Sequence, residues 1–444
     1  MANIQLSDHF TYGRLLRFVL PSISMMVFAS IYGVVDGLFV SNFVGKVPFA
    51  AVNLIMPAIM ILGPLGMVVG TGGSAIVAKT MGEGDYERAN RYFSLMVYAT
   101  AIGGSILALI GFIFMRPLSL LLGADGPMLE YCVLYGRVSM ISLAAYMLEN
   151  LFQTFLVTAE RPKMGFQVTL ISGITNMVLD ALFIAVFHWG VAGAALATAV
   201  SEYAGAVIPL VFFFRENGSP LRLGSTTLDW GLLGRTCING SSEFVSNTAF
   251  SLVSMIYNLQ LMRLAGENGV AAYGVMMYVN FIFVAIFFGY TLGAGPIISF
   301  HFGAKNTDEL RSLFRKSMVL MLIIGVGLTA LAFAAAHPLA KLFVGYDPEL
   351  FTMTRTGLRL YSLGFTLVGV NIFGSALFTA LNNGQVSALI SMVRSFVFKI
   401  CTVLTLPLVF GVNGIWLSML ASELLSLLLT LFFILRGRNK YQYY

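Results

Sequence analysis

Charged residues and cysteines are scarce in this sequence. Only 10% of its 444 residues are charged and 58% are hydrophobic, whereas a soluble domain has roughly 25% charged and about 45–50% apolar residues. The three cysteines, Cys132, Cys237 and Cys401, lie far apart in three apolar segments, which suits neither a disulfide framework nor a CxxC metal site. The composition therefore excludes a soluble or disulfide-stapled domain and indicates a chain that lies mostly in lipid.

Signals of catalysis and of ATP use are absent as well. No HExxH or Walker sequence occurs, the acids form no metal-ligand repeat, and the four histidines lie at the ends of apolar runs, at His9, His188, His301 and His337. We therefore expect no enzyme, no cofactor and no ATP-driven step, which leaves an ion gradient as the energy source. The net charge of +6 is spread over short connections, so no nucleic-acid partner is expected.

Twelve apolar runs are long enough to cross a bilayer, which takes about 20 residues of helix. The expected spans are residues 12–42, 49–79, 92–115, 128–158, 162–187, 190–214, 230–264, 270–302, 312–336, 350–381, 385–409 and 412–435. A polar break at residues 215–229 divides them into six and six. We therefore expect an all-α integral membrane protein with two bundles, residues 1–218 and 219–444. Residues 1–17 contain Asp8 and lack a small-residue cleavage site, so the first run is no signal peptide.

Lysine and arginine are distributed unevenly over the connections. The N-terminus, the even-numbered connections and the C-terminus hold 17 of them, and the odd-numbered connections with their flanks hold seven. Because positive charge marks the cytoplasmic side, both termini are expected in the cytoplasm. The remaining two, Arg394 and Lys399, fall inside the eleventh span.

The two halves repeat at an offset of 221 residues, since 293 − 72 = 221 and 303 − 82 = 221. The matching pairs include Gly72 with Gly293, Gly82 with Gly303, Thr158 with Thr379, and Glu202 with Glu423. Six spans in each half mean that both halves enter the membrane from the same side, as parallel repeats do. The substrate path is therefore expected between the halves.

Ionisable residues inside spans are candidates for function, because each costs at least about 2.5–3.5 kcal/mol at the bilayer centre. They are Asp36, Glu149, Asp180, Glu202, Glu243, Arg394, Lys399 and Glu423. At about 1.5 Å rise per residue, Asp36, Asp180 and Thr198 reach similar depths, and Asn176 lies one turn before Asp180. Two carboxylates with neutral oxygens suit either a shared proton or a sodium ion. Hydrogen bonding between neighbouring helices is the structural alternative.

The second half lacks an equivalent of this cluster, since the offset carries Asp36 onto Tyr257 and Asp180 onto Cys401. Ion coupling is therefore expected mainly in the first half. Lys399 and Glu423 lie at similar depths on adjacent spans, which predicts a buried ion pair.

The walls of the expected cavity combine acid, methionine and aromatic side chains. Glu243 interrupts the seventh span within a stripe of Asn and Ser residues that would be costly facing lipid. Methionine adapts to varied ligands and aromatic faces attract cations, although packing is the alternative role for each of them. The expected substrate-binding residues are Glu243, Asn150, Gln153, Met56, Met60, Phe155, Tyr257, Tyr273, Met277 and Tyr290. Together they predict amphiphilic organic cations as substrates.

Short motifs follow one another along both halves of the chain, namely Leu20-Pro21, Asp36-Gly37, Gly70-Thr71-Gly72-Gly73-Ser74, Gly82-Glu83-Gly84-Asp85, the stretch from Asn176 to Asp180, Gly293-Ala294-Gly295-Pro296 and His301-Phe302-Gly303-Ala304. In these motifs the sequence resembles the multidrug and toxic compound extrusion (MATE) transporters over essentially its whole length. The order, spacing and duplication of these motifs are more specific than any one of them. The chain looks closest to the MepA-like branch of bacterial drug exporters.

The resemblance implies two six-helix bundles in a V, alternating access, and exchange of organic cations or drugs for protons or sodium. It also implies an ion-coupling site at Asp36, Asn176, Asp180 and Thr198, and a wall of the second bundle at Glu243. Some members carry a further acid in the tenth span, where this chain offers only Asn371, Ser375 and Thr379. A monomer in a bacterial inner membrane is expected, surrounded by lipid and without an obligate protein partner.

A flippase of lipid-linked saccharides is the nearest alternative, since a related family shares this architecture. Such a protein must accommodate pyrophosphate, so several Lys or Arg residues should line its first-half cavity, and two extra spans are often present. Neither feature occurs in this sequence.

Overall fold

The structure is a computed structural model that describes residues 4–443, including all their side chains except those of Leu38, Ser41, Asn42 and Lys46. All regular elements within this range are helices. The N-terminal half comprises α1 (Tyr12–Phe43), α2 (Lys46–Leu62), α3 (Leu65–Gly82), α4 (Tyr86–Leu121), α5 (Gly126–Thr158), α6 (Pro162–Asp180), the π-helix η1 (Ala181–Val186) and α7 (Gly190–Phe214).

The C-terminal half begins after an irregular segment at residues 215–229. It comprises α8 (Trp230–Gly303), α9 (Thr307–Val344), α10 (Pro348–Ser362), α11 (Phe365–Ala380), α12 (Gly384–Met392), the π-helix η2 (Val393–Phe398), α13 (Lys399–Thr405), α14 (Pro407–Phe410) and α15 (Val412–Tyr441).

The twelve predicted spans are confirmed within the described residues. Ten helical segments are long and apolar enough to cross a membrane, and α10 with α11, bent by 43°, makes an eleventh. The twelfth arises because α8 is two spans joined at Gly266, whose backbone leaves the helical region (φ 61°, ψ −150°). Positive φ is costly for other residues. The two spans predicted at residues 230–264 and 270–302 are therefore separated by one glycine rather than by a loop.

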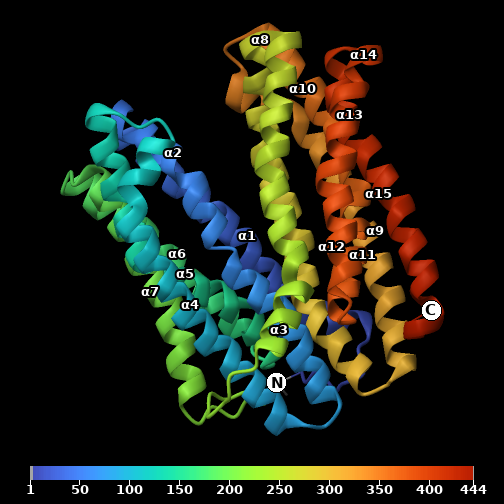
Figure 1. Cartoon of the computed structure of the whole chain (residues 1–444). Helices are drawn as coiled ribbons and strands as arrows, with labels where there is room; N and C mark the ends of the chain where they lie inside the picture. The colour runs from blue at the N-terminus through green and yellow to red at the C-terminus, as the bar shows by residue number, and fades with distance from the viewer. Residues whose placement is uncertain (1–3, 444) are drawn as a thin grey trace.

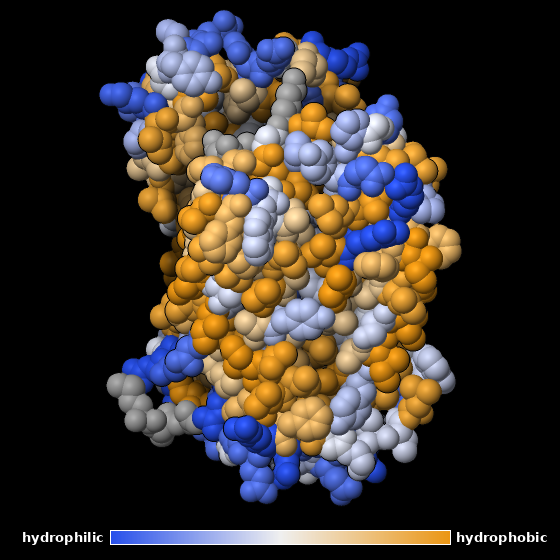
Figure 2. Space-filling model, turned by 90° about the vertical axis from the view of Figure 1, so that its left-hand side faces the viewer, coloured by the Kyte–Doolittle hydropathy of each residue, from blue (hydrophilic) through white to orange (hydrophobic). Residues whose placement is uncertain are grey.

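The two halves form a V whose arms meet at the end that carries both termini and diverge toward the other end (Figure 1). Hydrophobic side chains cover the middle of the face shown in Figure 2, and hydrophilic ones gather at both of its ends. A lipid-facing band bounded by polar ends is the surface expected of a multi-pass membrane protein.

Four glycines bring α3 and α8 into backbone contact where the arms meet. A Cβ on Gly72 would lie 2.1 Å from the Thr236 carbonyl oxygen, and one on Gly240 would lie 1.9 Å from that of Val68. Gly82 and Gly303 make the same kind of contact with each other's helix. We call Gly72, Gly82, Gly240 and Gly303 the glycine seal, because no side chain fits between the two halves there.

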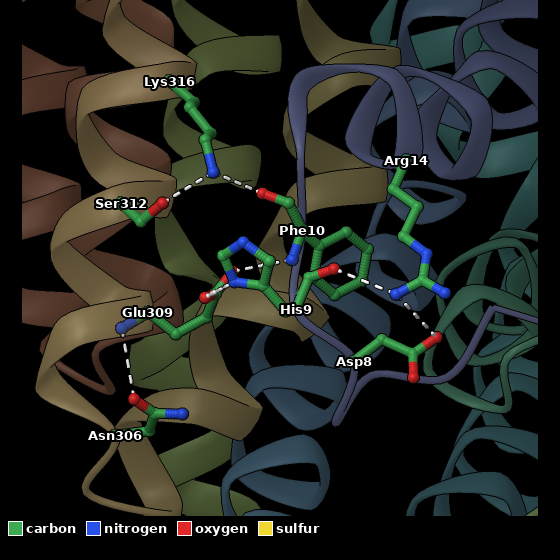
Figure 3. Close-up of polar contacts among 8 residues, drawn as sticks. All are labelled: Asp8, His9, Phe10, Arg14, Asn306, Glu309, Ser312 and Lys316. Carbon is green, nitrogen blue, oxygen red and sulfur yellow. Dashed lines mark hydrogen bonds and ion pairs between the residues drawn. The ribbon is translucent and has the colours of Figure 1, made fainter.

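The N-terminal segment connects the two halves, and Figure 3 shows its contacts with α9. The Phe10 N–H donates to Glu309 Oε1 (2.9 Å), and His9 Nδ1 lies 2.6 Å from Glu309 Oε2. The Lys316 ammonium donates to the Phe10 carbonyl. The Leu6 N–H donates to Glu160 Oε1 (2.8 Å), between α5 and α6. Residues 6–10, here named the N-terminal clasp, therefore connect the α5–α6 turn with α9.

Candidate functional site

The acid cluster of the N-terminal half is built around the end of α6. Asp180 is the last residue of α6, directly before η1, and its side chain is fully buried. Asn176 lies one turn earlier and is also buried. Because π-helical turns often occur at functional sites, the change of helix type at Asp180 is consistent with the predicted site.

The structure brings together the four residues predicted for ion coupling. Asn176 Nδ2 lies 3.5 Å from Thr198 Oγ1 on α7, and the Asp36 carboxyl on α1 lies within hydrogen-bonding reach of the Asp180 carboxyl. Three helices therefore converge on one set of oxygens, as their depths predict. The geometry is consistent with an ion-coupling role, which stays a prediction.

When both acids are ionised, several oxygens of this cluster receive no hydrogen bond from the described residues. They are both carboxylate oxygens of Asp180, Oδ1 of Asp36 and Oδ1 of Asn176. A buried polar atom without a partner costs about 1–3 kcal/mol, and more when charged. Protonation or a bound cation would remove this cost, so the cluster suits either.

The oxygens of the cluster are of the kinds that bind a hard cation. Carboxylate, amide and hydroxyl oxygens are all present, and oxygen is the ligand that such cations prefer. Within the described residues, no three His, Cys, Asp or Glu side chains surround a common metal position. A sodium ion would therefore be held by Asp36 and Asp180 together with Asn176 and Thr198.

Two further acids, Glu149 and Glu202, extend the cluster. Glu149 on α5 is buried against α7, where a Cβ on Gly205 would lie 2.5 Å from its Oε1. Glu202 on α7 lies near both Glu149 and Asp36. Among the Lys and Arg side chains that the structure describes, none pairs with any of the four acids. The sequence identified Glu149 and Glu202 as intramembrane acids, but only the packing of α5 against α7 joins them to the cluster.

A cavity of about 50 Å³ lies between the halves. Glu243 of α8 lines it together with Thr71 of α3, Thr154 of α5 and Thr379 of α11. Glu243 itself therefore faces the opposite half. A second opening of about 510 Å³ lies beside the glycine seal, lined by residues such as Lys79, Arg88 and Arg235.

A third cavity, of about 290 Å³, extends from α1 into the C-terminal half. Tyr257 and Tyr273 of α8 line it with stacked rings whose centroids are 5.2 Å apart. Arg394, Lys399 and Glu423 share this lining. Of the ten predicted substrate-binding residues, Glu243, Tyr257 and Tyr273 line the three cavities.

The other seven predicted residues lie elsewhere, and two of them are core residues. Phe155 is fully buried against Phe93, with ring centroids 4.8 Å apart. Tyr290 is fully buried and donates to Ser317 Oγ (2.8 Å). Met56, Met60, Asn150, Gln153 and Met277 line none of these three cavities. Hydropathy located their helices but not the direction of each side chain.

The predicted partner of Glu423 is wrong. Arg394 Nη1, not the Lys399 ammonium, lies 3.7 Å from Glu423 Oε1. The other carboxylate oxygen accepts from Asn371 Nδ2 (2.7 Å). Arg394 lies within the π-helix η2, where hydrogen bonds span five residues instead of four. This spacing turns the side chains relative to their positions in a regular α-helix. Equal depth alone could not choose between the two basic residues.

Comparisons with known proteins agree with this architecture. The model of the MatE family matches residues 21–182 and 244–405, one segment in each half. The multidrug export protein MepA of Staphylococcus haemolyticus (strain JCSC1435) is 22% identical over 427 residues, 96% of this chain and 94% of that protein. MepA of Staphylococcus aureus (strain MSSA476) is 23% identical over 429 residues, again 96% and 94%.

Solved structures share the fold at lower identity. A crystal structure of MATE in the straight conformation has a TM-score of 0.91 at 20% identity, covering 99% of this chain and 98% of that chain. The outward-facing conformation of a multidrug resistance MATE family transporter has a TM-score of 0.87 at 20% identity, with the same coverage. The V of two repeated bundles is therefore the fold of this chain.

Proposed function

Because this chain belongs to the MatE family, whose model matches both of its halves, we propose that it is a secondary active multidrug exporter. It would exchange amphiphilic organic cations for protons or sodium ions by alternating access. The names of the MepA relatives support export of drugs, and the relatives' source supports a bacterial cell membrane.

The proposal rests on one observation, the pairing of the buried Asp180 carboxyl with the part-buried Asp36 carboxyl, without a basic partner among the described side chains. Two negative charges in contact in a low-dielectric interior repel strongly. Such a pair takes up a proton or a cation when one is available. It can therefore carry the coupling ion, with Asn176 and Thr198 supplying neutral oxygens.

Besides a site for the coupling ion, transport requires a path that is open to one side of the membrane only. The V-shaped arrangement of the two halves provides such a path. The glycine seal and the N-terminal clasp join the halves at the end with both termini, and the arms diverge at the opposite end (Figure 1). Since basic connections mark the end with the termini as cytoplasmic, this arrangement corresponds to an outward-open state. Rocking the two bundles about the central cavities would open the other side.

Exchange follows from competition for negative charge. A lipophilic cation is attracted by the acids Asp36, Asp180 and Glu243 and by aromatic walls such as Tyr257 and Tyr273. Entry of a proton or sodium ion at Asp180 from outside removes part of that attraction, so the drug is released there. An ion that binds in this way is exchanged for the drug rather than carried with it.

Ethidium efflux from vesicles containing the purified full chain tests the proposal. Vesicles are given a proton gradient alone or a sodium gradient alone, with a collapsed gradient as the baseline. We expect efflux under at least one gradient, and the active gradient identifies the coupling ion. Efflux under neither gradient would contradict the proposal.

A further inference from the structure

The 290 Å³ cavity of the C-terminal half has a basic lining that cation export does not explain. Arg394 and Lys399 line it on one side, and Glu423 is the only acid in the lining. Met26 and Ser30 of α1 complete it from the N-terminal half, so the cavity reaches the interface between the arms. It therefore lies beside the proposed transport path.

The single acid of this lining is already engaged. Glu423 is fully buried, and its two oxygens face Arg394 (3.7 Å) and Asn371 (2.7 Å). Glu243, outside this lining, also lies in the field of Arg394. Arg394 thus has two acidic neighbours, and its Nε still has no acceptor among the described residues.

The Lys399 ammonium makes no ion pair among the described side chains, although it lies in the field of Glu423. It is the first residue of α13, directly after η2, and it faces the cavity. Lys399 is part-exposed, so its ammonium is open to the cavity rather than enclosed in the core. An ammonium without an ion pair at the wall of a cavity can bind the negative charge of a ligand.

The remaining walls suit an aromatic or apolar body. The Tyr257 and Tyr273 rings stack at an interplanar angle of 11°, and Phe250 packs on Phe281 with centroids 5.3 Å apart. All four residues line the cavity. The volume and walls are therefore those of a small amphiphile site, with one charged end.

We propose that this cavity is an anion subsite, in which Lys399 and Arg394 bind the carboxylate of an aromatic amphiphile. The two halves then present opposite charges, with acids at Asp36 and Asp180 and bases at Arg394 and Lys399. Both charged regions adjoin a π-helix, η1 after Asp180 and η2 around Arg394, in corresponding spans of the repeat. A zwitterion then meets both charged regions, and its export, unlike its binding, rests on the proposed function.

A matched pair of dyes tests the subsite. One is a rhodamine with a free benzoate carboxylate, and the other is the methyl ester of the same dye, so both carry the same delocalised cation. Binding to the detergent-purified full chain is measured by fluorescence polarisation. We expect Lys399→Met to weaken binding of the acid about tenfold or more, the loss typical of a charge-assisted hydrogen bond, and to leave ester binding unchanged.

Two control variants separate the carboxylate contact from other effects. Lys399→Arg keeps the charge and should keep acid binding. Lys341→Met removes an exposed lysine from the last turn of α9 and should change neither dye. Equal loss of both dyes in Lys399→Met, or no loss of either, overturns the subsite, as does failure of the acid to bind the wild-type chain.

A competition experiment on the wild-type chain decides the question if Lys399→Met does not fold. Benzoate should displace the acid dye and leave the ester bound, whereas displacement of neither dye overturns the proposal. Gradient-driven export of the ester tests the proposed exporter separately. If the ester is exported but Lys399→Met does not selectively weaken binding of the acid, the anion subsite is excluded and the proposed exporter function is retained.

Discussion

Gly82 of α3 and Gly303 of α8 occupy equivalent positions in the two halves and pack against each other's helix. A Cβ on Gly82 would lie 2.0 Å from the Phe300 carbonyl oxygen, and a Cβ on Gly303 would lie 2.0 Å from that of Lys79. The contact is symmetric, since 303 − 82 = 221 and 300 − 79 = 221. The internal repeat is therefore expressed as a pseudo-twofold contact that closes one end of the V.

Gly303→Ala should open or destabilise this contact. The added methyl meets backbone rather than a movable side chain, and overpacking typically costs about 1–3 kcal/mol. We expect a lower unfolding temperature of the purified protein and reduced ethidium efflux. Gly274→Ala is the matched control, because nothing lies within 4 Å of a Cβ there. Equal stability of the two variants would argue against a closed α3–α8 contact.

Asp180→Asn should fold normally and lose most gradient-driven efflux. The substitution keeps the shape of the side chain and removes the charge that faces Asp36. Asp36→Asn should have a similar effect, and the double variant should be little worse than either single one if both acids share one ion. Glu130→Gln, at an exposed acid paired with Arg116, serves as the control in the same vesicle assay. Additive losses would point to two independent ion sites.

Ethidium binding to the detergent-purified chain should weaken as the pH is lowered from mildly alkaline to mildly acidic. Protons then occupy the acids that attract the dye, so binding falls as the charge is lost. Asp180→Asn should flatten this dependence. Titration with sodium at constant pH tests the other ion in the same way. Binding that responds to neither ion would falsify direct competition for the acid charge.

Removing one partner of the Arg394–Glu423 pair should destabilise the protein more than removing both partners. Glu423→Leu alone leaves buried Arg394 without its closest acid, and breaking such a pair costs about 3–5 kcal/mol. The double variant Arg394→Met with Glu423→Leu should recover much of this loss, as measured by thermal unfolding of the purified variants. A double variant as unstable as the worse single one would show that the two residues act separately.

Glu309→Ala should release the N-terminal clasp. The Glu309 carboxylate accepts from the Phe10 N–H and contacts His9 (Figure 3), and hydrogen bonds to a charged group contribute about 1.5–3 kcal/mol. We expect amide hydrogen exchange at residues 6–10 to accelerate about tenfold or more. Asp308→Ala, at the exposed neighbouring acid, should leave this exchange unchanged. Unaltered protection in Glu309→Ala would mean that the segment is held by its buried Leu6 and Phe10 side chains instead.

The linear sequence was sufficient for every property that depends on distance along a helix. Hydropathy predicted twelve spans because the bilayer demands a minimum apolar length. A constant rise per residue placed Asp36, Asp180 and Thr198 at a common depth, and the structure brings them together. The 221-residue offset predicted two similar halves because each repeat must bury the same surfaces.

Properties that depend on rotation about a helix axis were decided only by tertiary packing. Packing turned Phe155 and Tyr290 into the core, joined Glu149 to the acid cluster, and gave Glu423 the partner Arg394 instead of Lys399. In lipid, apolar side chains are accommodated on every face of a helix, so hydropathy carries little information about the direction of any one of them. That direction is set by the neighbouring helices, here by contacts such as α3 on α8 and by the π-helical turns at Asp180 and Arg394.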